Sequence, residues 1–314
     1  MCTEHACRWR TSACSGSQQC RGESRSRMRR RCRRRWNPHG IHQILSDSDA
    51  LVTKPACHIG YRCSALNHIL TGIYTYAEFV LTVSAYLPVM AVSSVRHRND
   101  PTQRMPGRWM RRLGRTASWL TPLWHFHIEG RPPADIGHCA YVVVSNHEST
   151  ADPFLLSWLP WDMRWVAKEE LFRPPLTGWA MRLGGDIKLR RGQGDSIRAM
   201  MQECERALRA GIPIMLFPEG TRSKDGKLSR FKDGAFHLAI KAGVPVLPIA
   251  IAGTRQMRPK DSRWFGRARA CAKILEPLST EGLGPSDVDA LRDRCRDAIA
   301  AALPELQSRY GTVP

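Results

Sequence analysis

The sequence predicts an α/β fold, in which a mostly central β-sheet is covered by helices. Beyond residue 132, short apolar segments alternate with segments of helical periodicity, and many of the apolar residues are β-branched. Such segments are typical of strands buried on both faces, and their alternation with helices indicates a layered α/β domain. We expect strands at residues 140–145, 164–167, 186–189, 212–217 and 244–252.

Two helices of this domain are expected from the spacing of their apolar residues. The first should begin at Asp195 or Ser196 and stop at Gly211. Its apolar stripe indicates core packing and consists of Ile197, Met200, Met201, Cys204 and Leu208. The second should begin near Ser286, where the sequence SDVD offers an N-terminal cap, and continue through Ile299.

The chain divides into three predicted parts. Residues 1–66 form a basic, Cys- and Arg-rich tail without periodicity, which we expect to be disordered. Residues 67–131 form a membrane-associated segment, and residues 132–314 form the α/β domain with its C-terminal helix. Residues 1–60 carry 12 Lys and Arg against 4 Asp and Glu, so the tail could be a basic arm that binds lipid or nucleic acid. We favour the alternative that the tail is a dispensable extension.

An apolar run at residues 69–95 predicts a helix in contact with a membrane. Its only charged residue is Glu78. At about 1.5 Å per residue, a helix of this length could cross a hydrocarbon core of roughly 30 Å, although Glu78 and Pro88 also permit a re-entrant or interfacial helix. A buried helix of a soluble protein is the alternative. The Arg-rich segment at residues 96–115, interleaved with tryptophan, then favours the cytoplasmic face for the domain that follows.

The net charge of +20 predicts an anionic partner, such as phospholipid headgroups, a phosphorylated substrate or nucleic acid. Familiar nucleic-acid motifs are missing from the body of the chain, so we expect no nucleic acid. Seven of the eleven cysteines lie within the first 66 residues, without zinc-ligand spacing, and no metal site is predicted. The other four lie in apolar patterns, as buried cysteines do in a reducing compartment.

The strongest chemical motif is the segment NHESTAD at residues 146–152, directly after the first expected strand. Side chains beyond the carboxyl end of a strand in an α/β sheet face the ligand cleft. Asp152 followed by Pro153 predicts the N-cap and first residue of a helix, with a turn that lets the carboxylate reach the His147 imidazole. An imidazole held by a carboxylate is a competent general base for a hydroxyl group. Without further motifs, a His and an Asp at this spacing belong more often to a polar loop before a capped helix than to a catalytic pair.

A second motif, FPEGTRS at residues 217–223, follows another expected strand in the equivalent position. Gly220 permits a close approach of backbone N–H groups, and Arg222 can bind a phosphate through two parallel hydrogen bonds. A third segment, residues 185–192, carries Lys188 and Arg190 on one face of a strand and Arg191 on the other. At least one of these basic side chains should therefore face the cleft.

With these motifs in this order, the sequence resembles the glycerolipid acyltransferase family over roughly residues 68–280, and most closely its 1-acyl-sn-glycerol-3-phosphate acyltransferase branch. The NHxxxxD block of the family falls on Asn146, His147 and Asp152, and its Gly-to-Arg block on Gly185 and Arg191. Arg190 stands where the family often has Asp. The FPEGTRS block is matched in full at Phe217 to Ser223, and the VPVxPI block falls on Val244, Pro245, Val246, Pro248 and Ile249.

The resemblance implies direct transfer of a fatty acyl group to the sn-2 hydroxyl of 1-acyl-glycerol 3-phosphate, without an acyl-enzyme, giving phosphatidic acid. His147 would be the general base, and Asp152 would orient it. The acceptor phosphate would be held by Glu219, Gly220, Thr221, Arg222 and Arg191, with Glu219 ordering the loop. Supporting residues would be Asn146, Arg190, Pro218, Ser223 and Pro245. The donor would be acyl-CoA or acyl carrier protein, with no cofactor and no metal.

Two alternatives remain open at the level of sequence. The acceptor could instead be glycerol 3-phosphate, another lysophospholipid or an acylated amino acid, because the four blocks do not separate these. The other alternative is a non-enzymatic protein that binds membranes or nucleic acid through its basic segments. Whether acyl transfer survives deletion of residues 1–66 would discriminate this alternative from an enzyme.

Overall fold

The computed structural model describes residues 65–100, 102–223, 226–258 and 264–311. The predicted tail lies outside the described residues except for its last two residues, which belong to the first described helix.

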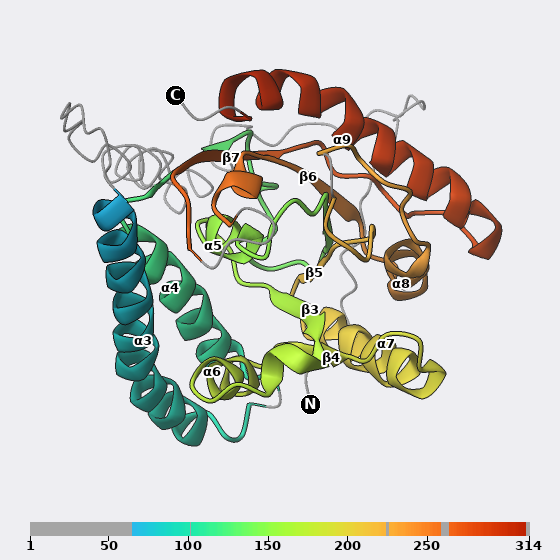
Figure 1. The fold of residues 1–314 in the computed structure, drawn as a ribbon. Helices are drawn as coiled ribbons and strands as arrows, with labels where there is room; N and C mark the ends of the chain where they lie inside the picture. The colour runs from blue at the N-terminus through green and yellow to red at the C-terminus, as the bar shows by residue number, and fades with distance from the viewer. Residues whose placement is uncertain (1–64, 101, 224–225, 259–263, 312–314) are drawn as a thin grey trace, which may run out of the picture. The chain divides into compact units, whose positions relative to one another are not determined.

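A seven-stranded sheet forms the centre of the domain, in the order β1-β7-β6-β2-β5-β3-β4 (Figure 1). The strands are β1 (Trp124–Glu129), β2 (Val142–Ser145), β3 (Arg164–Lys168), β4 (Ile187–Leu189), β5 (Ile214–Leu216), β6 (Val246–Ala252) and β7 (Ala268–Ile274). Strands β2 to β6 run parallel to one another. Strand β7 is antiparallel to β6 and pairs in parallel with β1. The predicted α/β fold is confirmed.

Each of the five expected strand segments contains a strand, whereas β1 and β7 are additional. Their sequences, WHFHIE and ARACAKI, alternate apolar residues with charged, polar or small ones and lack a continuous β-branched run. Both lie at one side of the sheet, where β1 alternates between buried and more exposed positions. Side chains on a partly exposed strand do not need to be uniformly apolar, which removes the signal used for the others.

Three helices cover one face of the sheet: α7 (Gly194–Arg209), α8 (Gly234–Ala242) and α9 (Val288–Tyr310). Helices α7 and α9 lie where the sequence predicts them, and a short 3₁₀ turn, η3 (Pro285–Asp287), precedes α9. Of the predicted α7 stripe, Met200, Cys204 and Leu208 are buried in the core. Ile197 departs from the prediction, because it is 42% exposed and lines the cavity described below.

The opposite face of the sheet is covered by the short helix α5 (Asp152–Leu156) and by aromatic side chains. Trp124 and Phe126 of β1 pack there with Trp161 and Leu155, all of them buried. The motif at residues 146–152 therefore leads from β2 directly into a helix that is fixed by this second core.

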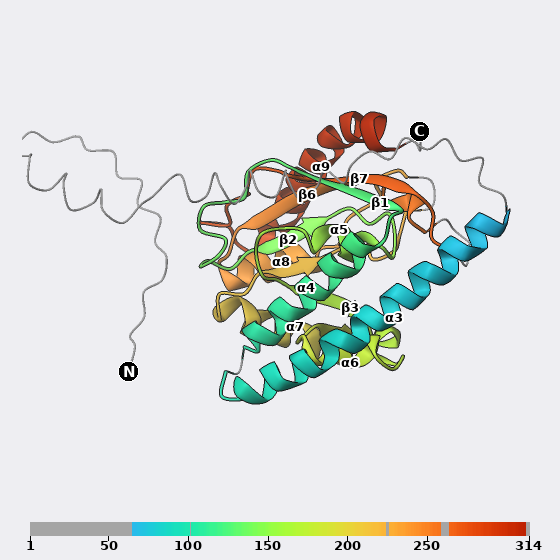
Figure 2. The ribbon, with the colours of Figure 1, turned by 90° about the vertical axis from the view of Figure 1, so that its left-hand side faces the viewer.

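Helices α3 (Ala65–Arg96), α4 (Arg104–Leu120) and α6 (Thr177–Leu183) form a separate layer beside the sheet (Figure 2). Val83, Met90, Leu113 and Ala180 form its small buried core. Helix α3 stays continuous through Pro88. By length and composition, its segment Ile69–Arg96 is long and apolar enough to cross a membrane. Much of this helix is exposed, including Leu81 at 70% and Val92 at 67%.

Candidate active site

The site lies where parallel strands end. Because β2 to β6 are parallel, their carboxyl ends meet at one edge of the sheet, and the NHESTAD and FPEGTRS motifs follow the neighbouring strands β2 and β5 there. The Ser223 N–H donates to the His147 carbonyl oxygen at 2.9 Å, which joins the two motif loops directly. The sequence therefore brings the two motifs together through strand order, although about seventy residues separate them.

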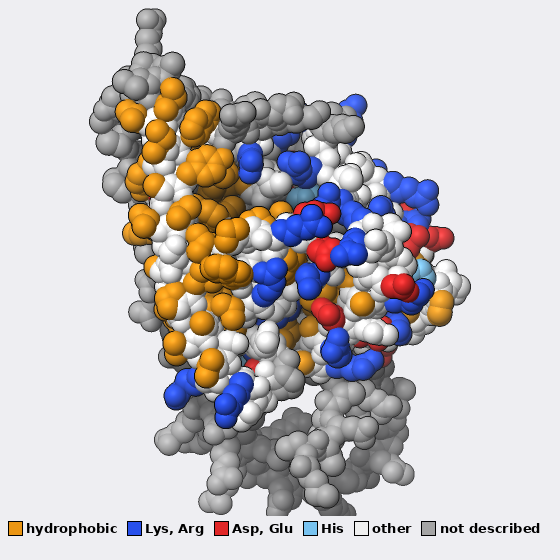
Figure 3. Space-filling view, turned by 60° about the horizontal axis from the view of Figure 1, so that its bottom comes forward, with side chains coloured by type: hydrophobic (Ala, Val, Ile, Leu, Met, Phe, Trp, Pro, Cys, Tyr) orange, Lys and Arg blue, Asp and Glu red, His pale blue; other side chains and the backbone are white. Residues whose placement is uncertain are grey.

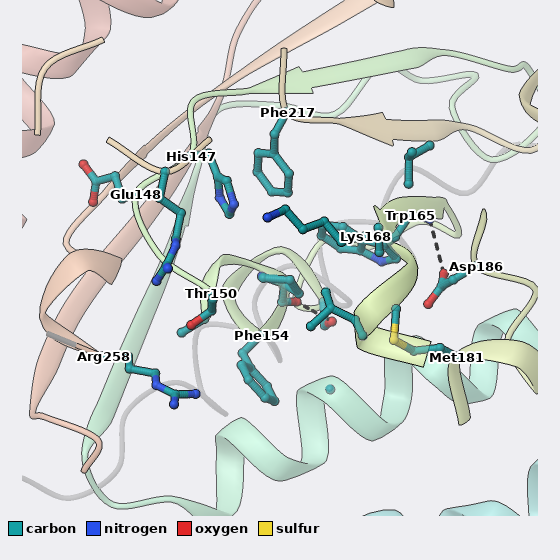
Figure 4. Close-up of a pocket in the computed structure, with 18 of the residues that line it drawn as sticks. His147, Glu148, Thr150, Phe154, Trp165, Lys168, Met181, Asp186, Phe217 and Arg258 are labelled. Carbon is teal, nitrogen blue, oxygen red and sulfur yellow. Dashed lines mark hydrogen bonds between the residues drawn. The ribbon is translucent and has the colours of Figure 1, made fainter. Parts of the chain in front are cut away.

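His147 and Asp152 form a close pair. His147 Nδ1 lies 2.6 Å from Asp152 Oδ2, and the imidazole stacks on Phe217 with ring centroids 4.2 Å apart. Figure 4 shows the imidazole pointing into the cavity beside Phe217. With the Nδ1 proton donated to the carboxylate, Nε2 is left to accept a proton from a bound hydroxyl group.

The Asp152 carboxylate is fully buried and held from several sides. It accepts hydrogen bonds from the backbone N–H groups of Glu148 at 3.0 Å and Ser149 at 3.1 Å, and from the Thr254 hydroxyl. The prediction that Asp152 is the N-cap is corrected: Ala151 is the N-cap, Asp152 is the first helical residue, and its carboxylate binds the preceding loop instead of capping the helix. This binding fixes the carboxylate against the imidazole.

A second carboxyl group, that of Glu148, lies close to this pair. The Thr254 hydroxyl, which bonds Asp152, lies 3.4 Å from Glu148 Oε2. Burial, and then the charge of Asp152, raise the pKa of Glu148 to about 7. Glu148 therefore exchanges its proton near neutral pH, next to the histidine's orienting carboxylate.

Two buried polar side chains hold the motif loops in place. The Glu219 carboxylate accepts from the N–H groups of His147 at 2.8 Å and Ser229 at 3.0 Å. The Asn146 amide donates to the Ile251 carbonyl at 2.9 Å and accepts from the Ile251 N–H at 2.8 Å, which ties the end of β2 to β6. Glu219 thus orders the loops, and both oxygens of its carboxylate are occupied by backbone donors instead of pointing at a ligand.

These loops border one cavity of about 2140 Å³ that extends between the sheet edge and the layer of α3, α4 and α6. Of the residues predicted for the site, those lining it are His147, Arg191, Pro218, Gly220, Thr221, Arg222 and Ser223. Those outside the lining are Asn146, Asp152, Arg190, Glu219 and Pro245. Asp152 lies directly behind His147, whereas Pro245 precedes β6, where its carbonyl accepts from the Val142 N–H at 3.1 Å.

The structure separates the two neighbouring arginines after β4. Arg190 extends away from the cavity and pairs with Glu169 at 2.5 Å. Arg191 lines the cavity and has no ion pair with any of the described residues. Arg191 is therefore the arginine of this block that can bind a ligand. The alternation along the strand placed the two arginines on opposite faces but did not decide which of them faces the cavity.

Comparison with known proteins identifies the family. A family model described as Acyltransferase matches residues 129–252. A 1-acyl-sn-glycerol-3-phosphate acyltransferase of Chlamydomonas reinhardtii is 32% identical over 231 residues, which cover 72% of this chain and 67% of that protein. The chain belongs to the 1-acyl-sn-glycerol-3-phosphate acyltransferase family. The resemblance inferred from the four blocks is thereby confirmed.

Two further relatives differ in how much of each chain the match covers. A sheep 1-acyl-sn-glycerol-3-phosphate acyltransferase alpha is 38% identical over 170 residues, which is 54% of this chain and 59% of the sheep protein. The chain thus spans about three fifths of the length of that relative. The crystal structure of a 1-acyl-sn-glycerophosphate acyltransferase from Thermotoga maritima superposes with a TM-score of 0.64 and 28% identity, covering 77% of this chain and 97% of that one.

Several residues of this candidate site lie outside the four blocks used for sequence reasoning. Lys168, at the end of β3, extends its ammonium group toward the space below His147 and Phe217 (Figure 4). Thr254 follows β6, and Arg258 lies beyond it. Lys168 and Thr254 share one signal with the NHESTAD and FPEGTRS motifs, a polar or basic residue at or just beyond the end of a strand, whereas Arg258 lies farther along the connection to β7.

A buried ion pair supports the far wall of the cavity. Arg111 of α4 lies 3.1 Å from Asp186, which also accepts from the Trp165 N–H at 3.2 Å. The Arg111 guanidinium stacks over the Trp165 ring at 4.8 Å. Burial lowers the pKa of Arg111 to about 10 and raises that of Asp186. Removing either partner would leave an uncompensated buried charge, so the pair fixes α4 against β3 and β4.

Proposed function

We propose that the protein transfers a fatty acyl group from an acyl thioester to the sn-2 hydroxyl of 1-acyl-glycerol 3-phosphate, giving phosphatidic acid. The observation that carries this proposal is the buried Asp152 carboxylate 2.6 Å from Nδ1 of His147, whose imidazole lines a cavity together with Arg222 and Arg191. The sheep and Chlamydomonas relatives are named for the same acyl transfer, which agrees with the proposal.

The transfer proceeds in one addition and one elimination. His147 Nε2 removes the proton from the acceptor hydroxyl as its oxygen attacks the thioester carbonyl carbon. The C–S bond then breaks, and the imidazolium returns the proton to the thiolate. Asp152 fixes the imidazole and stabilises its charged form during this step.

A direct transfer is supported by the state of the cysteines. Cys204, Cys271 and Cys295 are buried, and burial raises the pKa of each thiol to about 12, which keeps it protonated and unreactive. Cys139 is partly buried, and none of these four described cysteines lines the cavity. A thiolate beside His147 for an acyl-enzyme is therefore not available from the described cysteines.

The acceptor phosphate is assigned to Arg222, the backbone around Gly220, and Arg191. Arginine presents paired N–H donors that match phosphate oxygens. The Lys168 ammonium adds a third cation on the β3–β4 side of His147. Together these groups would hold the phosphate while the hydroxyl reaches the imidazole, so that positioning contributes a large part of the rate.

The substrates also explain the exposed apolar surface. Figure 3 shows hydrophobic side chains gathered on one side of the molecule, next to a hollow rimmed by lysine and arginine. The apolar helix α3 would contact the membrane in which the lysolipid resides, with the basic side chains facing headgroups of the cytoplasmic leaflet. The donor would be acyl-CoA or acyl carrier protein, and the reaction needs no cofactor.

Replacing His147 tests the central role. We expect His147→Ala to lower kcat about 10²-fold to 10⁴-fold, with little change in acceptor binding, because the base acts only as the hydroxyl reacts. His138→Ala, at an exposed histidine outside the cavity, is the matched control. An active His147→Ala enzyme would remove the base assignment. Assay of lysophosphatidate, glycerol 3-phosphate, lysophosphatidylcholine and an acylated amino acid with one acyl-CoA then identifies the acceptor.

A further inference from the structure

We propose that Arg255, Arg258 and Arg267 form a second anion-binding subsite, which receives the phosphate groups of a coenzyme A thioester. This inference rests on the proposed function and assigns the donor's place within the same cavity. All three arginines are exposed and line the cavity that His147 faces. They come from the connection between β6 and β7, which none of the four sequence blocks includes.

The backbone of this connection brings the arginines together. Arg255 lies in the 3₁₀ turn η2 (Thr254–Gln256) directly after β6, and Arg267 directly precedes β7. The Gly266 N–H donates to the Met257 carbonyl at 3.0 Å, so the two arms of the connection run side by side. Arg258 and Arg267 therefore lie on paired arms, each one residue beyond this hydrogen bond.

Arg258 has a defined orientation. Its guanidinium carbon lies 5.7 Å from the centre of the Phe265 ring, which packs in turn against Trp124 at 5.4 Å. Figure 4 shows Arg258 reaching into the cavity near Thr150, on the opposite side from Lys168. An aromatic ring below an arginine orients the guanidinium and leaves its N–H donors available to a ligand.

Arg255 lies against Gly226, which follows the FPEGTRS motif in the chain. Its Nη1 lies only 3.0 Å from the position that a Cβ on Gly226 would occupy. None of the three guanidinium groups pairs with a carboxylate of the described residues, in contrast to Arg190 with Glu169 and Arg309 with Glu129. Their charge is therefore available to a ligand.

Direct transfer requires two phosphate-bearing substrates at His147 at the same time. His147 follows β2, and in the sheet β2 lies between β6 and β7 on one side and β5, β3 and β4 on the other. Arg191 and Lys168 lie on the second side, and Arg258 and Arg267 lie on the first. The strand order thus places Arg258 and Arg267 across the base from Arg191 and Lys168, as two phosphate-bearing substrates would require.

The number of cations favours coenzyme A as the ligand. A lysolipid phosphate is a single group, whereas coenzyme A carries a diphosphate and a 3′-phosphate. Its pantetheine arm would extend from these phosphates to place the thioester at His147. Three arginines that can each bind phosphate through paired donors match such a charge.

Lipid phosphate is the other source of the same chemistry near this subsite. Phe265 packs against Tyr76 of α3 at 5.5 Å, so the arginines lie close to the helix that would face the membrane. The experiment must therefore separate a phosphate of the donor from a phosphate of the bilayer.

The test measures donor and acceptor KM for Arg258→Ala and Arg267→Ala with a short-chain acyl-CoA in zwitterionic micelles. We expect the donor KM to rise about tenfold or more, the acceptor KM to stay within about twofold, and inhibition by adenosine 3′,5′-bisphosphate to weaken in parallel. Arg269→Ala is the matched control, because this exposed arginine lies in β7 outside the cavity. It removes the same charge and should change neither KM.

An unchanged donor KM in both variants would overturn the subsite, and a rise in the acceptor KM alone would assign it to the lysolipid. Loss of activity only on vesicles that contain anionic lipid would assign the arginines to the bilayer. Calorimetric titration with free coenzyme A separates the subsite from the reaction. If the parent protein binds coenzyme A, Arg258→Ala weakens that binding, and the parent shows no acyl transfer, then the subsite is retained and the proposed function is rejected.

Discussion

Arg190 and Arg191 differ in environment although they are adjacent in the chain. Arg190 holds Glu169 on the surface, and Arg191 lines the cavity. We expect Arg191→Ala to raise the acceptor KM about tenfold by removing a charge-assisted hydrogen bond to phosphate, with a smaller effect on the donor KM. Arg190→Ala is the matched control, with an expected change below twofold. Steady-state kinetics with each substrate varied in turn checks both, and equal effects of the two variants would contradict the assignment.

Glu148 should make the stability of the protein depend on pH. Its pKa is raised from an ordinary value of 4.5 to about 7, so the folded protein binds this proton more tightly than the unfolded chain. Stability contributed by the neutral carboxyl is therefore lost as the pH rises from about 4.5 through about 7, up to roughly 3 kcal/mol. The neutral Glu148→Gln variant lacks this loss and should gain stability relative to the parent between pH 5 and pH 8.

Urea unfolding at the two pH values measures the difference, and Glu203→Gln, at an exposed position on α7, is the control for a change of charge. Parallel pH dependence of the parent and the Glu148→Gln variant would show that Glu148 ionises as easily in the folded state as in the unfolded chain.

At the residue scale, sequence reasoning identified the groups that lie in recognisable motifs. The pairing of His147 with Asp152 could be predicted, because their spacing and the following proline require a turn. The Thr254 hydroxyl that completes this cluster could not be predicted, since it comes from a strand end about a hundred residues later. Which of two adjacent arginines enters the cavity also depends on the twist and the end of β4, which sequence alternation leaves open.

At the scale of elements, the predicted strands are those buried on both faces. Strand β6 is buried along its whole length and its sequence is continuously apolar, so its composition identified it. Strands β1 and β7 required knowledge of their partners, because β1 pairs with a strand more than a hundred residues away. The connection between β6 and β7, which carries three cavity arginines, remained outside the sequence prediction for the same reason.

Gly253 fixes the start of that connection. Its φ is +92°, and a Cβ there would lie 2.1 Å from the Arg269 carbonyl oxygen and 2.7 Å from that of Tyr310. Neither backbone oxygen can move without disturbing β7 or α9. We expect Gly253→Ala to destabilise the fold by about 3 kcal/mol or more, which lowers Tm by roughly 10 °C. Gly137→Ala, where a Cβ would meet nothing within 4 Å, is the control in the same thermal unfolding experiment.

At the scale of the whole molecule, the charged cavity and the apolar helix lie next to each other. The hollow rimmed by basic side chains adjoins the hydrophobic surface in Figure 3, and residues of α3 such as Tyr76 and Phe79 line the same cavity as His147. A lysolipid has the same two parts, a phosphate headgroup and an acyl chain. This arrangement would let it enter the cavity from the bilayer while its phosphate stays among cations.

The apolar face of α3 can be tested separately from catalysis. Leu81 and Val92 are exposed and lie eleven residues apart, which places them on one face of the helix. We expect the double variant Leu81→Lys and Val92→Lys to reduce binding to zwitterionic phospholipid vesicles about tenfold or more, because each substitution removes a side chain worth roughly 2 kcal/mol on burial in lipid. Sedimentation with vesicles measures the bound fraction.

The control is the double variant Ala290→Lys and Ala301→Lys, at two exposed positions that also lie eleven residues apart, on α9. It adds the same charge and should leave vesicle binding unchanged. Equal vesicle binding by both double variants, with unchanged thermal stability, would contradict contact between α3 and the membrane.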